Sequence, residues 1–310
     1  MKQSEKVMIF FCLCLYFTCE ISLSQTVEKY LYCIEKIYYE NIFVKRSLYS
    51  LEDAKRYFLN QVGENHSLED SLKRTVYLIT EDPFLQIRKK DIVESGYYQE
   101  RSVDRDFELR VYNIGGFRVY YISFFEIGPN MARKYRDYLK SKIIDDGLVV
   151  IDVTMNMGGS LWSAAYFCSM FLPANSYLFS VNLLKKGKVL TQNFYSTSDY
   201  GDLFTKNFVV VLQDDSTVSA AEVIPGVLKR RALIFGDLTY GKPYVQGIYD
   251  INGLSIVYSN GFVSFGLELE PHSRLKPDIY LSRYEIDNKE WFVFFVCRVW
   301  LFVRGIVEGG

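Results

Sequence analysis

The sequence predicts an α/β fold with a largely parallel sheet, preceded by a small helical part at the N-terminus. Three uninterrupted apolar runs are typical of strands that are buried on both faces. Segments with helical spacing separate these runs, and such alternation is characteristic of parallel sheets. The runs are "LVVIDV" at 148–153, "NFVVVLQD" at 207–214 and "ALIFGD" at 232–237.

The first 24 residues are expected to be a signal peptide rather than part of the fold. Two lysines precede an apolar run over 7–17, and small residues before Gln25 offer a cleavage site. The run is short for a membrane span. We therefore expect export to the periplasm or cell envelope, with membrane association only through an uncleaved N-terminus or a lipidated Cys19.

Residues 25–90 are expected to form the helical N-terminal part. Two helices should begin after Ser50 and Ser67, because each serine is followed three residues later by an aspartate, close to a capping box. An earlier helix is indicated by apolar residues that share one face at helical spacing. That face consists of Val27, Tyr30, Leu31, Ile34 and Ile37.

Residues 81–108 are polar and are expected to be an irregular connector before the core. Two strands should flank the turn at Gly115 and Gly116, and an amphipathic helix should end near Gly147. Another helix is expected over about 160–171, after the first apolar run. A further pair of strands should flank the turn at 252–253.

The segment 286–310 is strongly apolar but contains Arg298 and Arg304. We expect it to be a packed last element or an interface, and its role is open. Outside the leader, the cysteines lie far apart in the sequence, which is typical neither of a disulfide framework nor of a metal cluster. Cys33, Cys168 and Cys297 are therefore expected to be buried thiols, with at most one bridge among them.

Charge and motifs exclude several classes of function. The chain has 36 basic and 37 acidic residues, a balance without the basic excess of a nucleic-acid-binding protein. It contains no P-loop, GxGxxG, HExxH or CxxC pattern, so we expect no cofactor and no metal. A short S-x-x-K run at 273–276 lies between two prolines, and we attribute it to chance.

Ser219 follows the second apolar run and opens the small-residue segment "SAAEVIPGVLKRR", which we expect to be a helix. At the first turn of a helix, unpaired N–H groups and the helix dipole favour negative charge. A serine hydroxyl at this place could act as a nucleophile. The alternative is that Ser219 is only an N-cap, with Glu222 as its capping partner.

A serine nucleophile needs a base, and the chain has only two histidines. His66 is expected at a helix cap and His272 in a turn, so no Ser-His-Asp triad is predicted. Lys242 follows the third apolar run, and apolar surroundings can leave a lysine as the neutral amine. Ser219 and Lys242 are therefore expected at one edge of the sheet. The alternative is that Lys242 is a solvated turn residue.

An acyl-transfer site also needs N–H donors for an oxyanion. The loop "DVTMNMGGS" contains Gly158 and Gly159, which allow close approach of the backbone. Its amides, together with that of Ala220, could supply these donors. The alternative is an ordinary glycine turn.

Four segments, taken in order, resemble the S41 serine peptidases, the carboxyl-terminal processing or tail-specific proteases. They are "DVTMNMGG", "STVSAAEV", "GDLTYGKPYVQG" and "LKPDIYL", and the likeness covers residues 108–282. The resemblance implies a ClpP/crotonase-like core over 108–285 that needs no metal or cofactor. It implies these roles: Ser219 as nucleophile, Lys242 as general base, Gln246 as the residue that orients the lysine, and Gly159 and Ala220 as donors of the oxyanion-hole amides.

The sequence departs from the family pattern in several places. Thr154 stands where the family usually has arginine, so an ion pair that braces the loop is expected to be missing. Too few residues separate 88 from 108 to hold a PDZ domain. The apolar end of the chain does not resemble the family's usual helical finish.

The prediction is an exported Ser–Lys endopeptidase that acts on peptides or protein tails. A catalytically inactive S41-like module that binds extended peptides is the alternative. A crotonase-like thioester enzyme shares the fold type, but it does not account for Ser219, Lys242 and Gln246 together.

Overall fold

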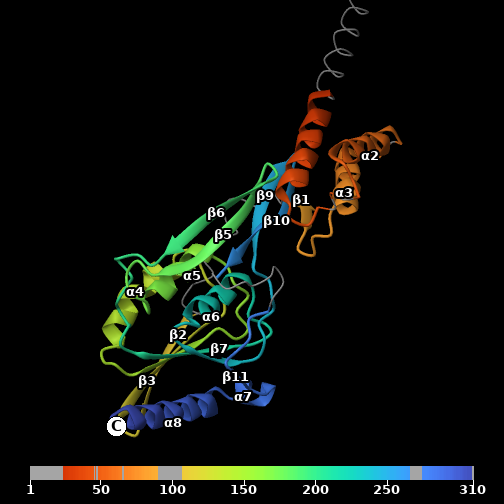
Figure 1. Cartoon of the computed structure of the whole chain (residues 1–310). Coiled ribbons are helices and arrows are strands. Elements are labelled where there is room, and N and C mark those ends of the chain that lie inside the picture. The colour runs from red at the N-terminus through yellow and green to blue at the C-terminus, as the bar shows by residue number, and fades with distance from the viewer. Residues whose placement is uncertain are drawn as a thin grey trace, which may run out of the picture. The chain divides into compact units, whose positions relative to one another are not determined.

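The computed structural model describes residues 24–44, 46, 48–64, 66–89, 107–265 and 274–308 (Figure 1). Residues 1–23 of the expected signal peptide, with Cys19, lie outside the described residues, as do His272 and the serine of the S-x-x-K run. The chain divides into two compact units. The N-terminal unit comprises Met1–Glu94, Leu183–Leu190 and Val245–Gly261, and the core unit comprises Ser95–Asn182, Thr191–Tyr244 and Phe262–Gly310.

Helices begin the N-terminal unit, as predicted. A helix over 24–40 is followed by α2 (Leu51–Gly63) and α3 (Leu68–Ile79). The hydroxyls of Ser50 and Ser67 accept hydrogen bonds from the N–H groups of Asp53 and Asp70, which confirms both predicted caps. Each cap satisfies an amide that the first turn of its helix leaves without a partner.

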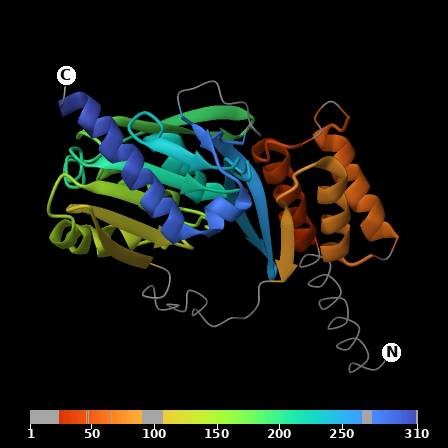
Figure 2. The same ribbon diagram turned by 90° about the horizontal axis from the view of Figure 1, so that it is seen from below.

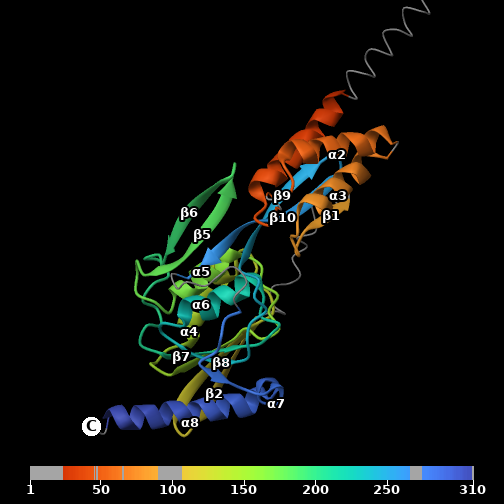
Figure 3. The same cartoon turned by 45° about the vertical axis from the view of Figure 1, so that its right-hand side comes forward.

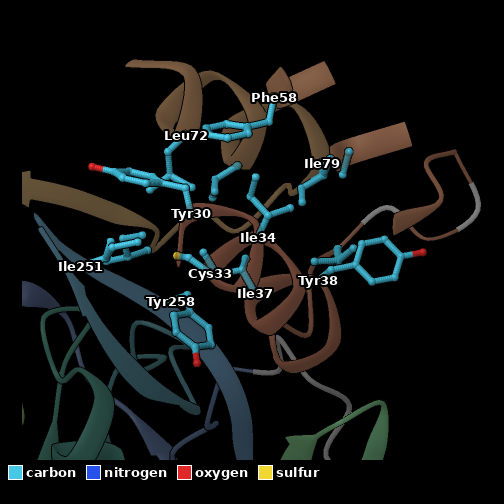
Figure 4. Packing of buried hydrophobic residues seen from close by; sticks show 14 of the residues in the cluster. Tyr30, Cys33, Ile34, Ile37, Tyr38, Phe58, Leu72, Ile79, Ile251 and Tyr258 are labelled. Carbon is cyan, nitrogen blue, oxygen red and sulfur yellow. The ribbon is translucent and has the colours of Figure 1, made fainter. Parts of the chain in front are cut away.

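The apolar face predicted for the first helix lies in the core of this unit. Figure 4 shows its side chains directed toward α2 and α3 on one side and toward two strands on the other. Those strands are β9 (Tyr244–Ile251) and β10 (Leu254–Ser264), which pair across the predicted turn at 252–253. The fully buried members include Ile34, Ile37, Phe58, Leu72 and Ile79.

The connector predicted over 81–108 is partly wrong, because it contains a strand. β1 (Gln86–Lys89) pairs antiparallel with β10, and Ile87 lies opposite Ile256. The strand is four residues long, and its alternation is too short to be recognised from the sequence. Asp82, just before it, accepts hydrogen bonds from the N–H and hydroxyl of Ser259 at 2.7 and 3.0 Å, which fixes the chain beside β10.

In the described part of the core unit, six strands form one sheet in the order β11-β8-β7-β4-β3-β2. β2 and β3 are antiparallel, and all other neighbours are parallel, as predicted. β4 is buried along its whole length, which explains its continuous apolar sequence. The strands are β2 (Phe107–Ile114), β3 (Phe117–Phe124), β4 (Leu148–Asp152), β7 (Phe208–Gln213), β8 (Leu233–Gly236) and β11 (Ile279–Tyr280).

Helices cover both faces of this sheet. Figures 1 and 3 show α4, α5 and α6 on one face and α8 along the other, and Figure 2 shows α8 crossing the strands. These elements are α4 (Met131–Lys142), α5 (Leu161–Ser169), the 3₁₀ helix η2 (Ser219–Glu222), α6 (Val223–Leu228), α7 (Arg283–Asp287) and α8 (Lys289–Glu308). The hairpin of β5 (Tyr177–Lys185) and β6 (Lys188–Tyr195) was not predicted.

The apolar C-terminal segment is the packed helix α8. Its buried side chains recur at helical spacing and meet the sheet, where the ring of Phe292 lies edge-on to that of Phe235 at 5.6 Å. Arg298 is on the exposed side of the helix. The buried residues are Phe292, Val293, Val296, Cys297 and Trp300. No helix among the described residues is long and apolar enough to cross a membrane.

The cysteine prediction is confirmed for the described part of the chain. Cys33, Cys168 and Cys297 are free and buried. Burial raises the pKa of the Cys33 thiol to about 12, so it stays protonated at neutral pH.

Phe292→Ala should lower the free energy of unfolding by about 3–5 kcal/mol, because a fully buried ring is lost from the core. Phe294→Ala is the matched control, since that ring on the same helix is 55% exposed, and it should change stability by less than about 1 kcal/mol. Urea denaturation of both variants measures the difference. Equal losses would show that α8 does not pack through the face described.

Candidate active site

Three loops follow neighbouring parallel strands of the core sheet. The glycine loop (154–159) follows β4, the serine loop (214–219) follows β7, and the lysine loop (237–243) follows β8. Because β4, β7 and β8 are parallel, all three loops leave the same edge of the sheet, where ligands bind in open α/β sheets.

Ser219 adopts a left-handed backbone conformation, with φ of +60°. For a residue other than glycine, such a conformation costs roughly 1–3 kcal/mol and requires support from its surroundings. Ser219 is the first residue of η2, and Val218 before it makes no side-chain cap. Val218 occupies the N-cap position, so Ser219 is not the N-cap, although Glu222 accepts its N–H as that alternative expected. The predicted helix is a 3₁₀ turn followed by the short helix α6.

The support comes from Glu222, whose side chain is directed back toward Ser219. One carboxylate oxygen, Oε2, accepts the N–H of Ser219 at 3.0 Å and the N–H of Lys242 at 2.8 Å. The other, Oε1, accepts the N–H of Gly241 at 2.8 Å and the hydroxyl of Thr239 at 2.6 Å. Glu222 therefore joins the serine loop to the lysine loop.

Sequence reasoning recognised Glu222 only as a partner of the helix terminus. Its exposed fraction is 3%, and burial raises the pKa of its carboxyl above the ordinary value, although the four hydrogen bonds lower it. One feature of the sequence could have identified Glu222. It is an acidic residue inside an apolar segment that follows a buried strand, and a buried charge at such a place needs several hydrogen-bond partners.

Lys242 follows Gly241, whose φ of +86° turns the chain after β8. Since the backbone amides of Ser219 and Lys242 bond to the same oxygen of Glu222, the two main-chain segments lie side by side. The structure thus brings the predicted nucleophile and base to one place at the level of the backbone. A contact between their side chains stays a prediction.

Gln246 lies in β9 and belongs to the N-terminal unit. Its side chain is exposed, and Nε2 donates to the carbonyl of Phe84 at 3.5 Å, a long hydrogen bond. The orientation of Lys242 by Gln246 therefore stays a prediction. His66 also lies in the N-terminal unit, directly before the cap of α3, and its Nε2 is 3.9 Å from a carboxylate oxygen of Glu64.

Both glycines of the glycine loop have positive φ, +88° at Gly158 and +131° at Gly159. A Cβ added to Gly158 would lie 2.6 Å from the carbonyl oxygen of Val218 and 2.9 Å from the nitrogen of Ala220. A Cβ added to Gly159 would collide with the carbonyl of Ile127. The backbone of the glycine loop therefore packs directly against the backbone that carries Ser219.

The amides on either side of Gly159 make hydrogen bonds within this region, and the oxyanion role of Gly159 and Ala220 stays a prediction. The N–H of Gly158 donates to Oδ1 of Asn156 at 2.8 Å, and that of Ser160 donates to the carbonyl of Ile127 at 2.7 Å. The amide of Gly159, which lies between those two amides in the chain, takes part in neither hydrogen bond. Ala220 is the second residue of η2, so its N–H is one of the first-turn donors that a helix cannot satisfy itself.

Hydrogen bonds join the glycine loop to the serine loop. The N–H of Val218 donates to the carbonyl of Asn156 at 2.9 Å, and the N–H of Met155 donates to Oδ1 of Asp214 at 3.0 Å. The hydroxyl of Thr217 donates to the carbonyl of Val153 at 2.9 Å. These bonds hold the relative position of the two loops.

Thr154 itself forms no ion pair, as expected, but a cation from elsewhere in the chain lies beside it. Lys289, the first residue of α8, has its Nζ 3.0 Å from Oδ2 of Asp152, the last residue of β4. The same Nζ donates to the hydroxyl of Thr154 at 2.7 Å. A cation from the C-terminal helix therefore reaches the start of the loop. This pair could not be predicted from the sequence, because its residues lie far apart along the chain.

Among the described residues, no group of three or more His, Cys, Asp or Glu side chains could hold a metal ion. The polar groups at this edge of the sheet are hydroxyls, amides, carboxylates and lysines. Such groups can carry out nucleophilic attack, proton transfer and stabilisation of an oxyanion.

The chain resembles known proteins in sequence and in fold. Residues 119–280 match the family described as Peptidase family S41. A carboxyl-terminal-processing protease of Synechocystis sp. is 29% identical over 105 residues, which cover 33% of this chain and 23% of that protein. The corresponding protease of Picosynechococcus sp. is 30% identical over 104 residues, with the same coverage of both chains. The matched part thus spans about a quarter of these relatives.

Solved structures share the fold at lower identity. A lipoprotein from Streptococcus agalactiae has a TM-score of 0.61 and 14% identity, and the match covers 86% of this chain and 96% of that one. A protein from Parabacteroides merdae has a TM-score of 0.55 and 16% identity, with 84% and 92% covered. At these identities the likeness concerns the fold.

Gly158→Ala should lower the free energy of unfolding by about 2–4 kcal/mol, because a strained φ and a collision with the serine loop act together. Gly116→Ala is the matched control. Its φ of +85° is nearly the same, but nothing lies within 4 Å of the added Cβ, so the loss should be about 1–2 kcal/mol. Urea denaturation followed by tryptophan fluorescence compares the two. Equal losses would contradict the close packing of the loops.

Glu222→Gln should change how stability depends on pH. Burial raises the pKa of the folded carboxyl above its unfolded value of about 4.3, so the folded state binds this proton more tightly. The stability of the parent relative to the variant should therefore be greatest below about pH 4.3 and should decline as the pH rises through the raised pKa. Denaturation curves between pH 4 and 8 test this, and a relative stability that rises with pH would contradict it.

Proposed function

The chain belongs to peptidase family S41, and we propose that it is a serine endopeptidase that cleaves peptides or protein tails with Ser219 and Lys242. The observation that carries the proposal is the shared bond of both backbone amides to one oxygen of Glu222. That bond holds a serine in a strained, helix-opening position next to a lysine on the neighbouring loop. Nucleophiles in such turns present the hydroxyl to a substrate.

In the proposed mechanism, the neutral amine of Lys242 removes the proton from the hydroxyl of Ser219 as its Oγ attacks the substrate carbonyl. The carbonyl oxygen becomes an oxyanion, and the amides of Gly159 and Ala220 donate to it. The intermediate then collapses. The ammonium of Lys242 returns the proton to the leaving amine, and the acyl group stays on Ser219.

Water completes the proposed cycle. Lys242, neutral again, takes a proton from a water molecule that attacks the acyl-enzyme, and the same two amides stabilise the second oxyanion. Lys242 then protonates Oγ of Ser219 as the product acid leaves, and that acid loses its remaining proton to solvent. Gln246 is assigned the orientation of Lys242 through the family resemblance. Each step uses groups of the chain, the substrate and water.

Ser219→Ala and Lys242→Ala should each reduce kcat/KM by at least about 10³-fold, and the double variant should be no worse, because residues that act as a unit lose their effect together. Hydrolysis of an unfolded protein substrate, followed by mass spectrometry of the products, measures the rates. Lys140→Ala, which removes an exposed lysine on α4, is the control and should keep the parent rate.

Labelling with a fluorophosphonate separates the peptidase from the inactive peptide-binding module. The peptidase should be labelled in the parent and not in Ser219→Ala. A parent that binds extended peptides but neither cleaves them nor reacts with the probe would instead be the binding module. Equal cleavage by the parent and Lys242→Ala would overturn the dyad.

We also propose export to the cell envelope. The support is the sequence pattern of two lysines and an apolar run over 7–17 ahead of small residues. Substrates would then be peptides or proteins of that compartment. The mass of the protein purified from a secreting host tests this, since removal of residues 1–24 and acylation at Cys19 give different values.

A further inference from the structure

Asp152 is a buried carboxylate at the end of β4, directly before the glycine loop. Its side chain is 4% exposed, and a charge in such a place requires several partners. The hydroxyl of Tyr121 donates to Oδ2, while the N–H and hydroxyl of Thr154 donate to Oδ1 at 2.9 and 2.7 Å. The partner that carries a positive charge is Lys289, at 3.0 Å from Oδ2.

The place of Lys289 in its own helix does not favour a cation. It is the first residue of α8, where the positive end of the helix dipole disfavours a positive charge. Its side chain is only 25% exposed, and it contacts both Asp152 and the Thr154 hydroxyl. The carboxylate, rather than the helix, accounts for a lysine at this position.

The docking of α8 rests on other residues. Its apolar face, which includes Phe292 and Val296, lies in the core beneath the sheet. Lys289 lies outside that apolar cluster, at the end of the sheet where the glycine loop begins. A role in the loop is therefore separable from a role in holding the helix.

A second cation, Arg283 in α7, makes a similar contact. Nη1 of Arg283 in α7 lies 3.2 Å from Oδ2 of Asp214, whose side chain is 1% exposed. Oδ1 of Asp214 in turn accepts the N–H of Met155 in the glycine loop at 3.0 Å. Two cations from α7 and α8 thus contact the start of the glycine loop or its neighbours. Lys289 contacts Asp152 and Thr154, and Arg283 contacts Asp214, which in turn binds the loop.

We propose that Lys289 is a positioning residue for the reaction, because its ammonium, paired with Asp152 and Thr154, fixes the glycine loop that presents the Gly159 amide. It supplies from α8 the positive charge that an arginine at position 154 would supply from the loop itself. This role rests on the proposed function, since its effect on rate is transmitted through the oxyanion amide. Lys289 does not touch the substrate.

The kinetic test compares changes at Lys289 with a change on the exposed side of the same helix. Lys289→Met should lower kcat by about 10- to 100-fold and change KM by less than about threefold, since an oxyanion donor acts in the transition state. Lys289→Gln keeps a donor without the charge, and it should lose a similar amount. Lys289→Arg keeps the charge and should stay within about threefold of the parent. Arg298→Met is the matched control and should have no effect.

Thr154→Arg in the Lys289→Met background should restore most of the lost kcat, because the charge then comes from the loop. A folded double variant that is no more active than Lys289→Met would overturn the proposal. So would a Lys289→Met protein with parent kinetics, or a Lys289→Arg protein as impaired as Lys289→Met. Thermal melting establishes which variants are folded, and Lys289→Gln takes the place of Lys289→Met if the latter does not fold.

Hydrogen exchange read by mass spectrometry tests the proposal without any substrate. The amides of 153–160 should exchange faster in Lys289→Met than in the parent, Lys289→Arg and Arg298→Met, while those of 291–301 in α8 should be unchanged. Equal loss of protection in both segments would make Lys289 a docking residue and would overturn the proposal. A parent that hydrolyses nothing would refute the proposed function, and the exchange result would still decide the role of Lys289 in the loop.

Discussion

One buried carboxylate, that of Glu222, determines the geometry of the candidate site. A carboxylate at 3% exposure loses its hydration, and the loss is offset only if nearly every lone pair finds a donor. Here the donors are three backbone amides and one hydroxyl, each at 3.0 Å or less. Hydrogen bonds to a charged group contribute about 1.5–3 kcal/mol each. That is enough to hold Ser219 in its left-handed conformation.

The same arrangement explains why the backbones of Ser219 and Lys242 can lie side by side although they are 23 positions apart in the chain. A side chain on a flexible loop could approach Ser219 in many ways, but Oε2 of Glu222 binds both backbones and so limits the choice. Gly158 limits the third loop, because its missing side chain lets the glycine loop rest against Val218 and Ala220. Backbone contacts thus set the relative positions of the three loops, and the positions of the side chains depend on them.

Much of the core fold could be predicted from the sequence, because the controlling pattern is local. Continuous apolar runs identified β4, β7 and β8, and serine–aspartate pairs identified the starts of α2 and α3. The hairpin of β5 and β6 was missed. Its turn is Lys186–Gly187, with φ of +49° and +74°, and lysine is not a typical first residue of such a turn. β6 is also mostly exposed, so it lacks a strong apolar alternation.

The site could be predicted only where its residues lie in short motifs. Ser219, Lys242 and the two glycines stand in such motifs, and the structure places their backbones together, whereas Gln246 lies in the other unit and its role is still a prediction. The partnership of Asp152 with Lys289 was invisible, because it depends on which face of α8 packs against the sheet. For that reason, threonine in place of arginine at position 154 was interpreted only as the loss of an ion pair. A motif shows which residues lie in a loop, but it does not show that a lysine from a helix distant in the sequence will contact that loop.

Two further buried carboxylates connect the candidate site to the C-terminal helices α7 and α8. Asp152 comes just before the glycine loop and Asp214 begins the serine loop, and each pairs with a cation that lies beyond residue 282. A buried carboxylate that loses its cation is destabilising by about 3–5 kcal/mol. The native geometry of the two loops therefore includes contacts with α7 and α8. The last helix, α8, therefore has two separate sets of contacts. Its apolar face packs against the sheet, and its first residue, Lys289, contacts Asp152 and Thr154 beside the candidate site.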